Sequence, residues 1–213
     1  MNCTFIIPAR RDSQEIPFKN RLLLENTISV IPKEYLISNT IITTNDDLIE
    51  SMGLDCGTRV HRRSENSATN TASTTECLKE VIDDYGLTGT IVMMYLTYPE
   101  RSWSDILAIY DWYKNKKSKS LLCREEIVKD HPYLCAFELG DDMGKQIVSH
   151  NLYRRQDYPK CFRISWFVSM FECSELPNLN LNLYNEDTLY FPIKHALDID
   201  TPFDMENLTK RNS

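Results

Sequence analysis

Apolar runs alternate with amphipathic stretches along most of this sequence, and the alternation predicts strands separated by helices. The strand-like runs are residues 3–7, 40–44, 90–96 and 118–123. Residues 3–7 are nearly unbroken and contain β-branched residues, as is typical of a strand buried on both faces. Residues 71–85 and 104–114 instead place apolar side chains at helical spacing. We therefore expect a three-layer αβα fold, with a mostly parallel sheet and helices on both faces.

The remaining segments are expected to complete one domain over residues 1–213. Residues 124–163 are polar and rich in His, Tyr and turn residues, which predicts an excursion from the sheet. A short helix is predicted from Asp46 to Met52, with Gly53 as its stop signal. Residues 163–171 return to strand character.

The tail of the chain predicts a strand and then a helix. We interpret residues 191–200 as a strand that ends in two carboxylates. Thr201 and Pro202 are typical of the N-cap and the first position of a helix.

Composition narrows the classes of function. The net charge of -7 argues against broad nucleic-acid binding, because no excess of Lys and Arg is present to neutralise a phosphate backbone. The seven cysteines contain no Cys-x-x-Cys spacing, so they predict neither a zinc cluster nor a disulfide framework. With no basic leader and no run of roughly 20 apolar residues, we expect a soluble, cytoplasmic protein without a membrane partner.

A polar loop over residues 9–20 follows the first strand and carries three cations, Arg10, Arg11 and Lys19. Ligands of open α/β sheets bind beyond the carboxyl ends of strands, where this loop must lie. Guanidinium and ammonium groups gathered there would hold a triphosphate. The same residues are compatible with a solvated loop, and the Gly-Lys-Ser/Thr ending of a Walker loop is absent.

Asp198 and Asp200 are separated by one residue, which on a strand would direct both carboxylates to the same side. Such a pair suits a hard divalent cation, and Mg²⁺ is the expected cofactor. A capping or surface role is the alternative. The four histidines have no partner in sequence, and without a Gly-x-Ser-x-Gly elbow they do not indicate a serine hydrolase.

Five short motifs occur in order and together span most of the chain. They are Ile6-Ile-Pro-Ala-Arg10 with Ser13, Ile16-Pro17 and Lys19-Asn20; Arg63 with Ala68-Thr-Asn-Thr-Ala-Ser73; Met93-Met-Tyr-Leu-Thr-Tyr-Pro-Glu-Arg-Ser102; Arg154-Arg-Gln-Asp-Tyr-Pro159 with Phe162-Arg163; and Asp198-Ile-Asp-Thr201 with Asp204. Singly these motifs are weak, but the ordered set resembles the CMP-sialic acid synthetase (acylneuraminate cytidylyltransferase) family. The resemblance implies a Rossmann-like nucleotidyltransferase sheet.

The resemblance also implies a reaction, in which CTP and a nine-carbon α-keto acid sugar give a CMP-sugar and pyrophosphate. Arg10, Lys19 and Asp200 would be catalytic, and Asp198 with Asp200 would hold Mg²⁺. The implied nucleotide-binding residues are Ala9, Arg10, Ser13, Lys19, Asn20, Arg63, Ser73 and Tyr95. The implied sugar-binding residues are Arg155, Gln156 and Ser165. Members of the family are dimers, so the 124–163 excursion would join two copies.

The sequence departs from the family at several positions that face its substrates. Arg11 and Asp12 stand where two glycines are usual, and Gln14 replaces a lysine. Tyr95 and Tyr98 replace a glutamine and a serine, and Ser165-Trp166 replaces Asn-Gly.

These departures leave two alternatives to an active cytidylyltransferase. One is a degenerate relative that acts as a binding protein, and the other is a nucleotidyltransferase that uses another nucleotide.

Overall fold

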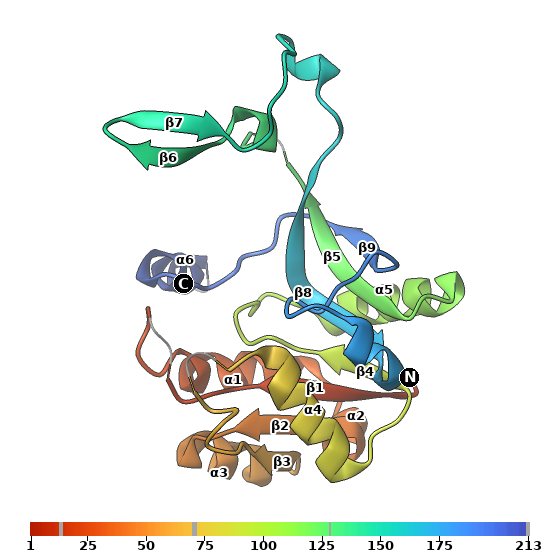
Figure 1. Ribbon diagram of the computed structural model, residues 1–213. Coiled ribbons are helices and arrows are strands. Elements are labelled where there is room, and N and C mark those ends of the chain that lie inside the picture. The colour runs from red at the N-terminus through yellow and green to blue at the C-terminus, as the bar shows by residue number, and fades with distance from the viewer. Residues whose placement is uncertain (13–14, 70–71, 128, 212–213) are drawn as a thin grey trace.

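A seven-stranded sheet forms the centre of the protein, in a computed structural model that describes residues 1–12, 15–69, 72–127 and 129–211 (Figure 1). The strand order is β3-β2-β1-β4-β8-β5-β9. The first four of these are mutually parallel, β8 is antiparallel to both of its neighbours, and β5 and β9 are parallel. Their bounds are β1 Cys3–Pro8, β2 Thr40–Thr44, β3 Arg59–Arg62, β4 Thr90–Met93, β5 Ser120–Glu126, β8 Phe162–Glu172 and β9 Leu189–Ile193.

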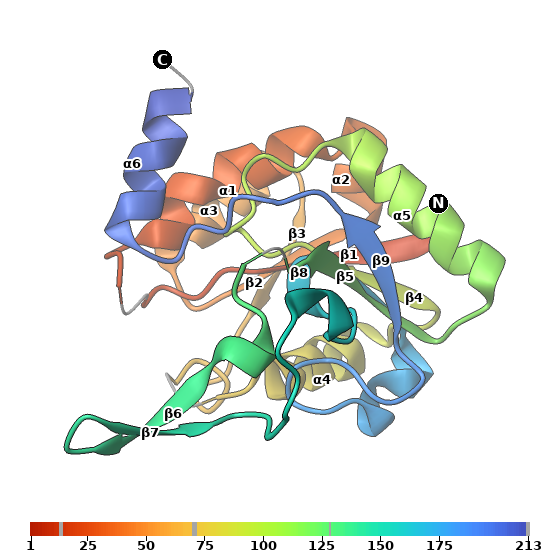
Figure 2. The same ribbon diagram turned by 90° about the horizontal axis from the view of Figure 1, so that it is seen from above.

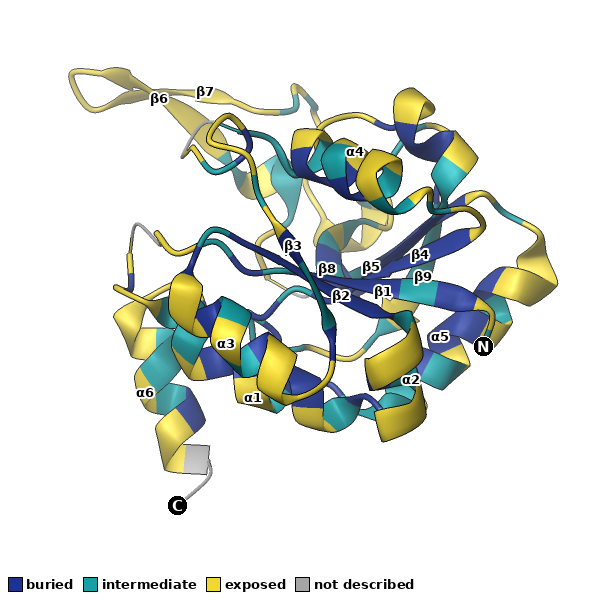
Figure 3. Cartoon of the chain, turned by 90° about the horizontal axis from the view of Figure 1, so that it is seen from below, coloured by how far each residue is buried: buried dark blue, intermediate teal, exposed yellow. Residues whose placement is uncertain are grey.

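Helices cover both faces of this sheet, which confirms the three-layer prediction (Figures 2 and 3). One face carries α1, α2, α3, α5 and α6. The other face carries α4 and the segment that follows β8, residues 173–184. The helices are α1 Lys19–Val30, α2 Lys33–Asn39, α3 Asp47–Asp55, α4 Thr74–Tyr85, α5 Trp103–Lys116 and α6 Pro202–Arg211. No helix of the described ranges is long and apolar enough to cross a membrane.

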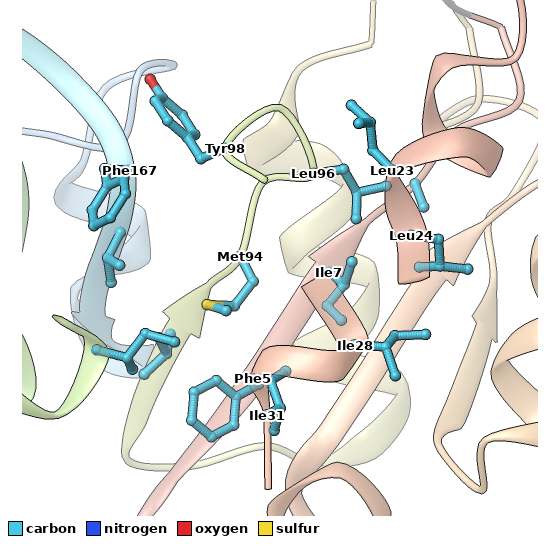
Figure 4. Close-up of a cluster of buried hydrophobic side chains, with 14 of the residues drawn as sticks. Phe5, Ile7, Leu23, Leu24, Ile28, Ile31, Met94, Leu96, Tyr98 and Phe167 are labelled. Atoms are coloured by element: carbon cyan, nitrogen blue, oxygen red, sulfur yellow. The ribbon is translucent and has the colours of Figure 1, made fainter. Parts of the chain in front are cut away.

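Side-chain alternation along β1 divides the core into two clusters. Phe5 and Ile7 pack into the larger cluster, under α1 and α5, whereas Ile6 packs against α4 on the opposite face (Figure 4). All three side chains are completely buried. Successive side chains of a strand point to opposite faces, so an unbroken apolar run is what a central strand with two covered faces requires.

Helix α3 is longer than the sequence predicted. The Asp46 carboxylate caps it by accepting from the N–H groups of Leu48 and Ile49, but the helix continues past Gly53 to Asp55. The interpretation of Gly53 as a stop signal is therefore wrong. A Cβ at this position would lie 2.9 Å from Ile42 Cδ1 and 3.0 Å from Val60 Cγ2, so glycine allows α3 to approach the sheet closely.

The tail is only partly the strand that the sequence predicted. Strand β9 ends at Ile193, and residues 194–200 are not extended in a ladder. Ile199 still donates to the Thr97 carbonyl at 2.8 Å and is completely buried. The predicted start of the last helix is confirmed, because Thr201 and Asp204 exchange hydrogen bonds and Pro202 is the first residue of α6.

Residues that leave the sheet after β5 form a projecting arm before the chain returns at β8 (Figure 1). The arm carries a hairpin of β6 Ala136–Gly140 and β7 Met143–Gln146, in which every residue is exposed. At its base, Tyr133 stacks on His150 with ring centroids 4.3 Å apart, and Tyr158 packs against both rings. The arm thus has its own aromatic base but no cover over its hairpin among the described residues.

Gly53→Ala tests the close contact between α3 and the sheet. Alanine gains about 1 kcal/mol of helix propensity over glycine, but overpacking costs about 1–3 kcal/mol. We expect a net loss of about 1 kcal/mol in the free energy of unfolding, measured by urea denaturation. Ser51→Ala is the control, because Ser51 is exposed on the same helix and should not lose stability. Equal or greater stability of Gly53→Ala would contradict the packing argument.

Candidate functional site

Two adjoining cavities open beyond the carboxyl ends of β1 and β4. The first, the basic cavity, has a volume of about 350 Å³ and is lined by Pro8, Arg10, Asp12, Lys19, Asn20, Arg63, Ala72, Ser73, Thr74, Tyr95, Leu96 and Thr97. The second, the acidic cavity, has a volume of about 340 Å³ and is lined by Thr74, Tyr95, Thr97, Tyr98, Trp166, Leu181, Asn182, Asp198 and Asp200. They share Thr74, Tyr95 and Thr97, so the two cavities form one trough.

The loop after β1 is fixed by hydrogen bonds to the end of β2. Ala9 donates to the Thr43 carbonyl at 2.9 Å, and its own carbonyl accepts from the Thr44 hydroxyl at 2.6 Å. Arg11 N–H donates to Asn45 Oδ1 at 2.8 Å. These bonds hold the backbone beside the basic cavity in place before any ligand arrives.

Three cations face the basic cavity: Arg10, Lys19 and Arg63. Among the described residues, neither arginine forms an ion pair with a carboxylate, and Arg63 donates through Nε to the Thr43 carbonyl at 3.3 Å. Burial lowers the pKa of the Arg63 guanidinium, which remains a cation at neutral pH. Partly buried positive charge without a carboxylate partner is costly, and an anionic ligand would supply that partner.

Lys19 lies at the border between the cavities. Its side chain is only 12% exposed, and its ammonium donates to the Ile199 carbonyl at 2.7 Å and to Asp200 Oδ1 at 3.3 Å. Asn20, the next residue of α1, donates to the Arg10 carbonyl at 2.7 Å. The first turn of α1 therefore connects the loop after β1 with the tail that carries the two aspartates.

The first turn of α4 lines the basic cavity on another side. Ser73 Oγ accepts from Glu76 N–H at 3.1 Å, and the Glu76 carboxylate accepts from Ser73 N–H at 2.8 Å, which is a capping box. The positive end of the helix thereby points toward the cavity, where it favours anions. Tyr95 lies nearby, and burial raises the pKa of its hydroxyl to about 12, so it stays neutral.

The acidic cavity contains a carboxylate atom without a hydrogen-bond partner. Asp198 Oδ1 is buried and unpaired within the described part of the chain. Burial raises the pKa of Asp198, the neighbouring charge of Asp200 raises it further, and hydrogen bonds from Thr97 and Tyr98 oppose the increase. No group of three or more His, Cys, Asp or Glu side chains gathers around a metal position in the described ranges. Mg²⁺ needs only one or two carboxylates, so the pair suits this cation.

Arg101 joins Tyr95, which lines the acidic cavity, to β8, a role that sequence reasoning did not predict. It is 3% exposed and donates to the carbonyls of Tyr95, at 2.7 Å, and of Phe167 on β8. Burial lowers its pKa to about 10. Tyr98, which lines the acidic cavity, packs edge-to-face on Phe167, with centroids 5.8 Å apart (Figure 4).

The predicted site residues line the basic cavity, line the acidic cavity, or lie outside both. Six nucleotide candidates line the basic cavity: Arg10, Lys19, Asn20, Arg63, Ser73 and Tyr95. Ala9 is completely buried behind the cavity, and Ser13 lies outside the described residues. Asp198 and Asp200 line the acidic cavity, whereas Ser165 is buried and bonds to the Phe167 N–H.

Arg155 and Gln156 lie in the arm and line neither cavity. Arg155 instead lines a third cavity of about 450 Å³ at the base of the arm, together with Arg124 and Lys160. Sequence reasoning missed Leu181 and Asn182, which line the acidic cavity from the turn after β8. Their positions depend on the return of that turn to the sheet, for which the sequence carries no local signal.

Beneath the loop, Asp46 and Arg21 form a bidentate pair at 2.7 and 3.0 Å, with Asp46 completely buried. Burial acts to raise the pKa of Asp46, but hydrogen bonds from Arg21, Leu48 N–H and Ile49 N–H outweigh burial and hold the pKa below its usual value. The ionised form therefore stabilises the fold above the unfolded pKa of about 3.9. This contribution is lost as the pH falls through the lower pKa of the folded state.

Asp46→Asn isolates this charge, because asparagine is an equally good N-cap. We expect a loss of about 2 kcal/mol in the free energy of unfolding at pH 7, the scale of hydrogen bonds to a charged group. The difference from the unsubstituted protein should shrink below about pH 4. Asp47→Asn is the matched control, since Asp47 is exposed and its pair with Arg62 should contribute less than about 1 kcal/mol. A pH-independent loss would contradict the assignment.

Comparisons with known proteins bear on the fold and on the family resemblance. No protein-family model matches the chain. N-acylneuraminate cytidylyltransferases of Streptococcus agalactiae serotypes V and III are each 27% identical over 163 residues, which cover 71% of this chain and 39% of the relatives. The chain thus spans about two-fifths of the length of those curated relatives.

Solved structures share the fold. A CMP:2-keto-3-deoxy-manno-octonic acid synthetase in complex with CTP superposes with a TM-score of 0.70 over 100% of both chains, at 12% identity. A cytidylyltransferase from Leptospira borgpetersenii gives a TM-score of 0.61 over 98% of this chain and 85% of its own, at 17% identity. The resemblance found in the sequence motifs is confirmed: the chain is similar to N-acylneuraminate cytidylyltransferases and has the fold of these solved nucleotidyltransferase structures.

Proposed function

We propose that this chain transfers CMP from CTP to a nonulosonic, sialic-acid-like sugar and releases pyrophosphate. The observation that carries the proposal is the division of charge along one trough. In the described ranges, Arg10 and Arg63 face one cavity without a carboxylate partner, and the unpaired Asp198 oxygen lies in the other, with Lys19 between them. A triphosphate suits the first environment, and a hydroxyl that must lose a proton suits the second.

In this proposal the basic cavity binds CTP. Arg10, Arg63 and the first turn of α4 would hold the phosphates, since preorganised cations and N–H groups stabilise phosphate charge without rearrangement. Lys19, at the border, would stabilise the charge that develops on the attacked α-phosphate. Asn20 keeps the Arg10 backbone in position through its 2.7 Å bond and would also contact the nucleotide, as would Ser73 and Tyr95.

Asp198 and Asp200 would hold Mg²⁺, and the fit rests on the unpaired Asp198 oxygen beside a second carboxylate. When bound, the cation would neutralise charge on the triphosphate. Asp200 is exposed and lies 3.3 Å from Lys19, so it would accept the proton from the attacking anomeric hydroxyl. Ser165, behind Tyr98, would support the sugar-binding wall.

Arg155 and Gln156 would reach a sugar through a second copy of the chain, because their arm projects from the sheet (Figure 1). The hairpin exposes three large apolar side chains, Phe137, Leu139 and Met143, at 57–62%. Exposed apolar groups of this kind are typical of an interface. We therefore propose a homodimer in which Arg155 contacts the sugar carboxylate in the site of the partner.

A pyrophosphate-release assay with CTP, Mg²⁺ and a panel of nonulosonic acids tests the reaction. The unsubstituted protein should turn over at least one acid, and Asp200→Ala should lose at least about a hundredfold in kcat, because metal binding and proton transfer would both be removed. Asp111→Ala is the control, since Asp111 is exposed on α5 outside both cavities. Circular dichroism verifies that each variant is folded.

Absence of pyrophosphate release from folded protein would overturn the proposed reaction. Calorimetry then separates the alternatives. If the protein binds no CTP, it acts as a partner protein that keeps the nucleotidyltransferase fold. The Asp12 carboxylate in the basic cavity would contribute to this outcome, because it repels phosphate. Greater thermal stabilisation by another triphosphate than by CTP would indicate a different nucleotide.

The homodimer is tested by Phe137→Asp with Leu139→Asp in the hairpin. Charges in an apolar interface are unpaired, so we expect a dimer of the unsubstituted protein and a monomer of the double variant in analytical ultracentrifugation. Glu138→Gln, between the two positions, is the control and should leave the dimer intact. A monomeric unsubstituted protein at micromolar concentration would contradict the proposal.

A further inference from the structure

Trp166 forms a fixed wall of the acidic cavity. Its indole N–H donates to the Asn182 carbonyl at 3.2 Å, and its backbone N–H donates to the Tyr98 hydroxyl at 3.3 Å. The ring also packs against the larger core cluster. Because its polar group is already bonded to protein, the indole has only apolar surface to offer a ligand.

The turn that Trp166 contacts, residues 180–184, is also fixed by hydrogen bonds. Asn180 Oδ1 accepts from the N–H groups of Asn182, at 2.9 Å, and Tyr184, at 3.2 Å. Leu183 between them is 2% exposed and packs into the smaller core cluster. The wall made by Trp166 and Asn182 is thus anchored from both sides and cannot withdraw without breaking these contacts.

The lining of the trough determines which part of an acceptor meets this wall. A hydroxyl that attacks the α-phosphate must lie near the residues that both cavities share, Thr74, Tyr95 and Thr97. Trp166 and Asn182 line the acidic cavity alone. Asp200 also lines only this cavity, but its contact with Lys19 places its carboxylate at the border, where the hydroxyl would react. Trp166 and Asn182 instead bond to each other, and we place the part of the acceptor remote from the reacting hydroxyl against them.

Charge and shape limit what that remote part can be. In the described lining of the acidic cavity, Asp198 and Asp200 are the charged side chains, and both are acidic. With both carboxylates engaged by Mg²⁺, the wall made by Trp166 and Asn182 offers no cation to pair with a second anionic group, whereas hydroxyls would find a partner in the Asn182 side-chain amide. The indole surface suits the hydrocarbon face of a sugar ring, and its bulk opposes a large substituent on that ring.

We infer that Trp166 is a specificity-determining residue, which selects nine-carbon acceptor acids with a hydroxyl in place of a bulky acylamino group on the sugar ring. The inference rests on the proposed function and narrows its substrate class. It assigns Trp166 a role in acceptor choice alone, because the residue does not line the basic cavity.

Two probe acids that differ in one substituent test the inference: N-acetylneuraminic acid and its 5-hydroxy counterpart. With the unsubstituted protein, kcat/KM for the 5-hydroxy acid should exceed that for the N-acetyl acid at least about tenfold. Trp166→Ala should bring this ratio close to one, through a lower KM for the N-acetyl acid and a higher KM for the 5-hydroxy acid. The KM for CTP should stay within about twofold.

Two further variants distinguish selection from general damage. Trp166→Phe keeps an aromatic wall and should retain most of the preference. Trp112→Ala makes the same substitution on α5, where the ring packs on Phe191 outside both cavities, and should leave the ratio unchanged. An active Trp166→Ala variant with the original ratio would overturn the inference and leave the proposed reaction standing.

If the unsubstituted protein transfers CMP to neither acid, the proposed reaction fails, and calorimetric titration with the two acids decides the inference separately. A Kd ratio that changes at least about tenfold between the unsubstituted protein and Trp166→Ala supports the role of Trp166. An unchanged ratio, or no binding of either acid, overturns it.

Discussion

Four consecutive polar residues at the end of β2 hold most of the segments that line the basic cavity. The Thr43 carbonyl accepts from Ala9 and from Arg63, and the Thr44 carbonyl accepts from the Arg63 N–H. Asn45 binds the Arg11 backbone, and Asp46 binds Arg21 of α1 while capping α3. The site depends on these bonds. The cations of the basic cavity repel one another, and the hydrogen-bonded backbone keeps them close together despite that repulsion.

The same arrangement explains why charge is divided along the trough. Arginines from the end of β1 and from the segment after β3 meet on one side, since the parallel strands β1, β2 and β3 present their carboxyl ends together. The aspartates arrive from the tail, which Ile199 fixes against Thr97. Lys19 bonds to the tail and thereby limits how far the two charged regions can separate.

The departures from the family pattern lie mainly where this trough would meet its substrates. Asp12 adds a carboxylate to the basic cavity, and Tyr98 and Trp166 add large rings to the acidic cavity. The fold accommodates both rings through specific contacts, including the Tyr98 hydroxyl with the Trp166 backbone. Identity of 27% to the curated relatives is consistent with a retained scaffold and a changed lining.

The layered fold follows from local patterns, because the unbroken apolar runs of β1 and β4 and the helical periodicity of α4 and α5 report burial directly. The sequence by itself also identified the cations after β1 and the aspartate pair, since each lies in one short segment. What these groups face depends on tertiary packing. Packing also explains the glycine within α3, where Ile42 and Val60 leave no room for a Cβ. Residues 194–200 leave the ladder, and Ile199 bonds to the Thr97 carbonyl instead. The wall of Trp166 and Asn182 likewise joins β8 to a later turn. Contacts between distant segments depend on packing, and local sequence patterns carry no record of them.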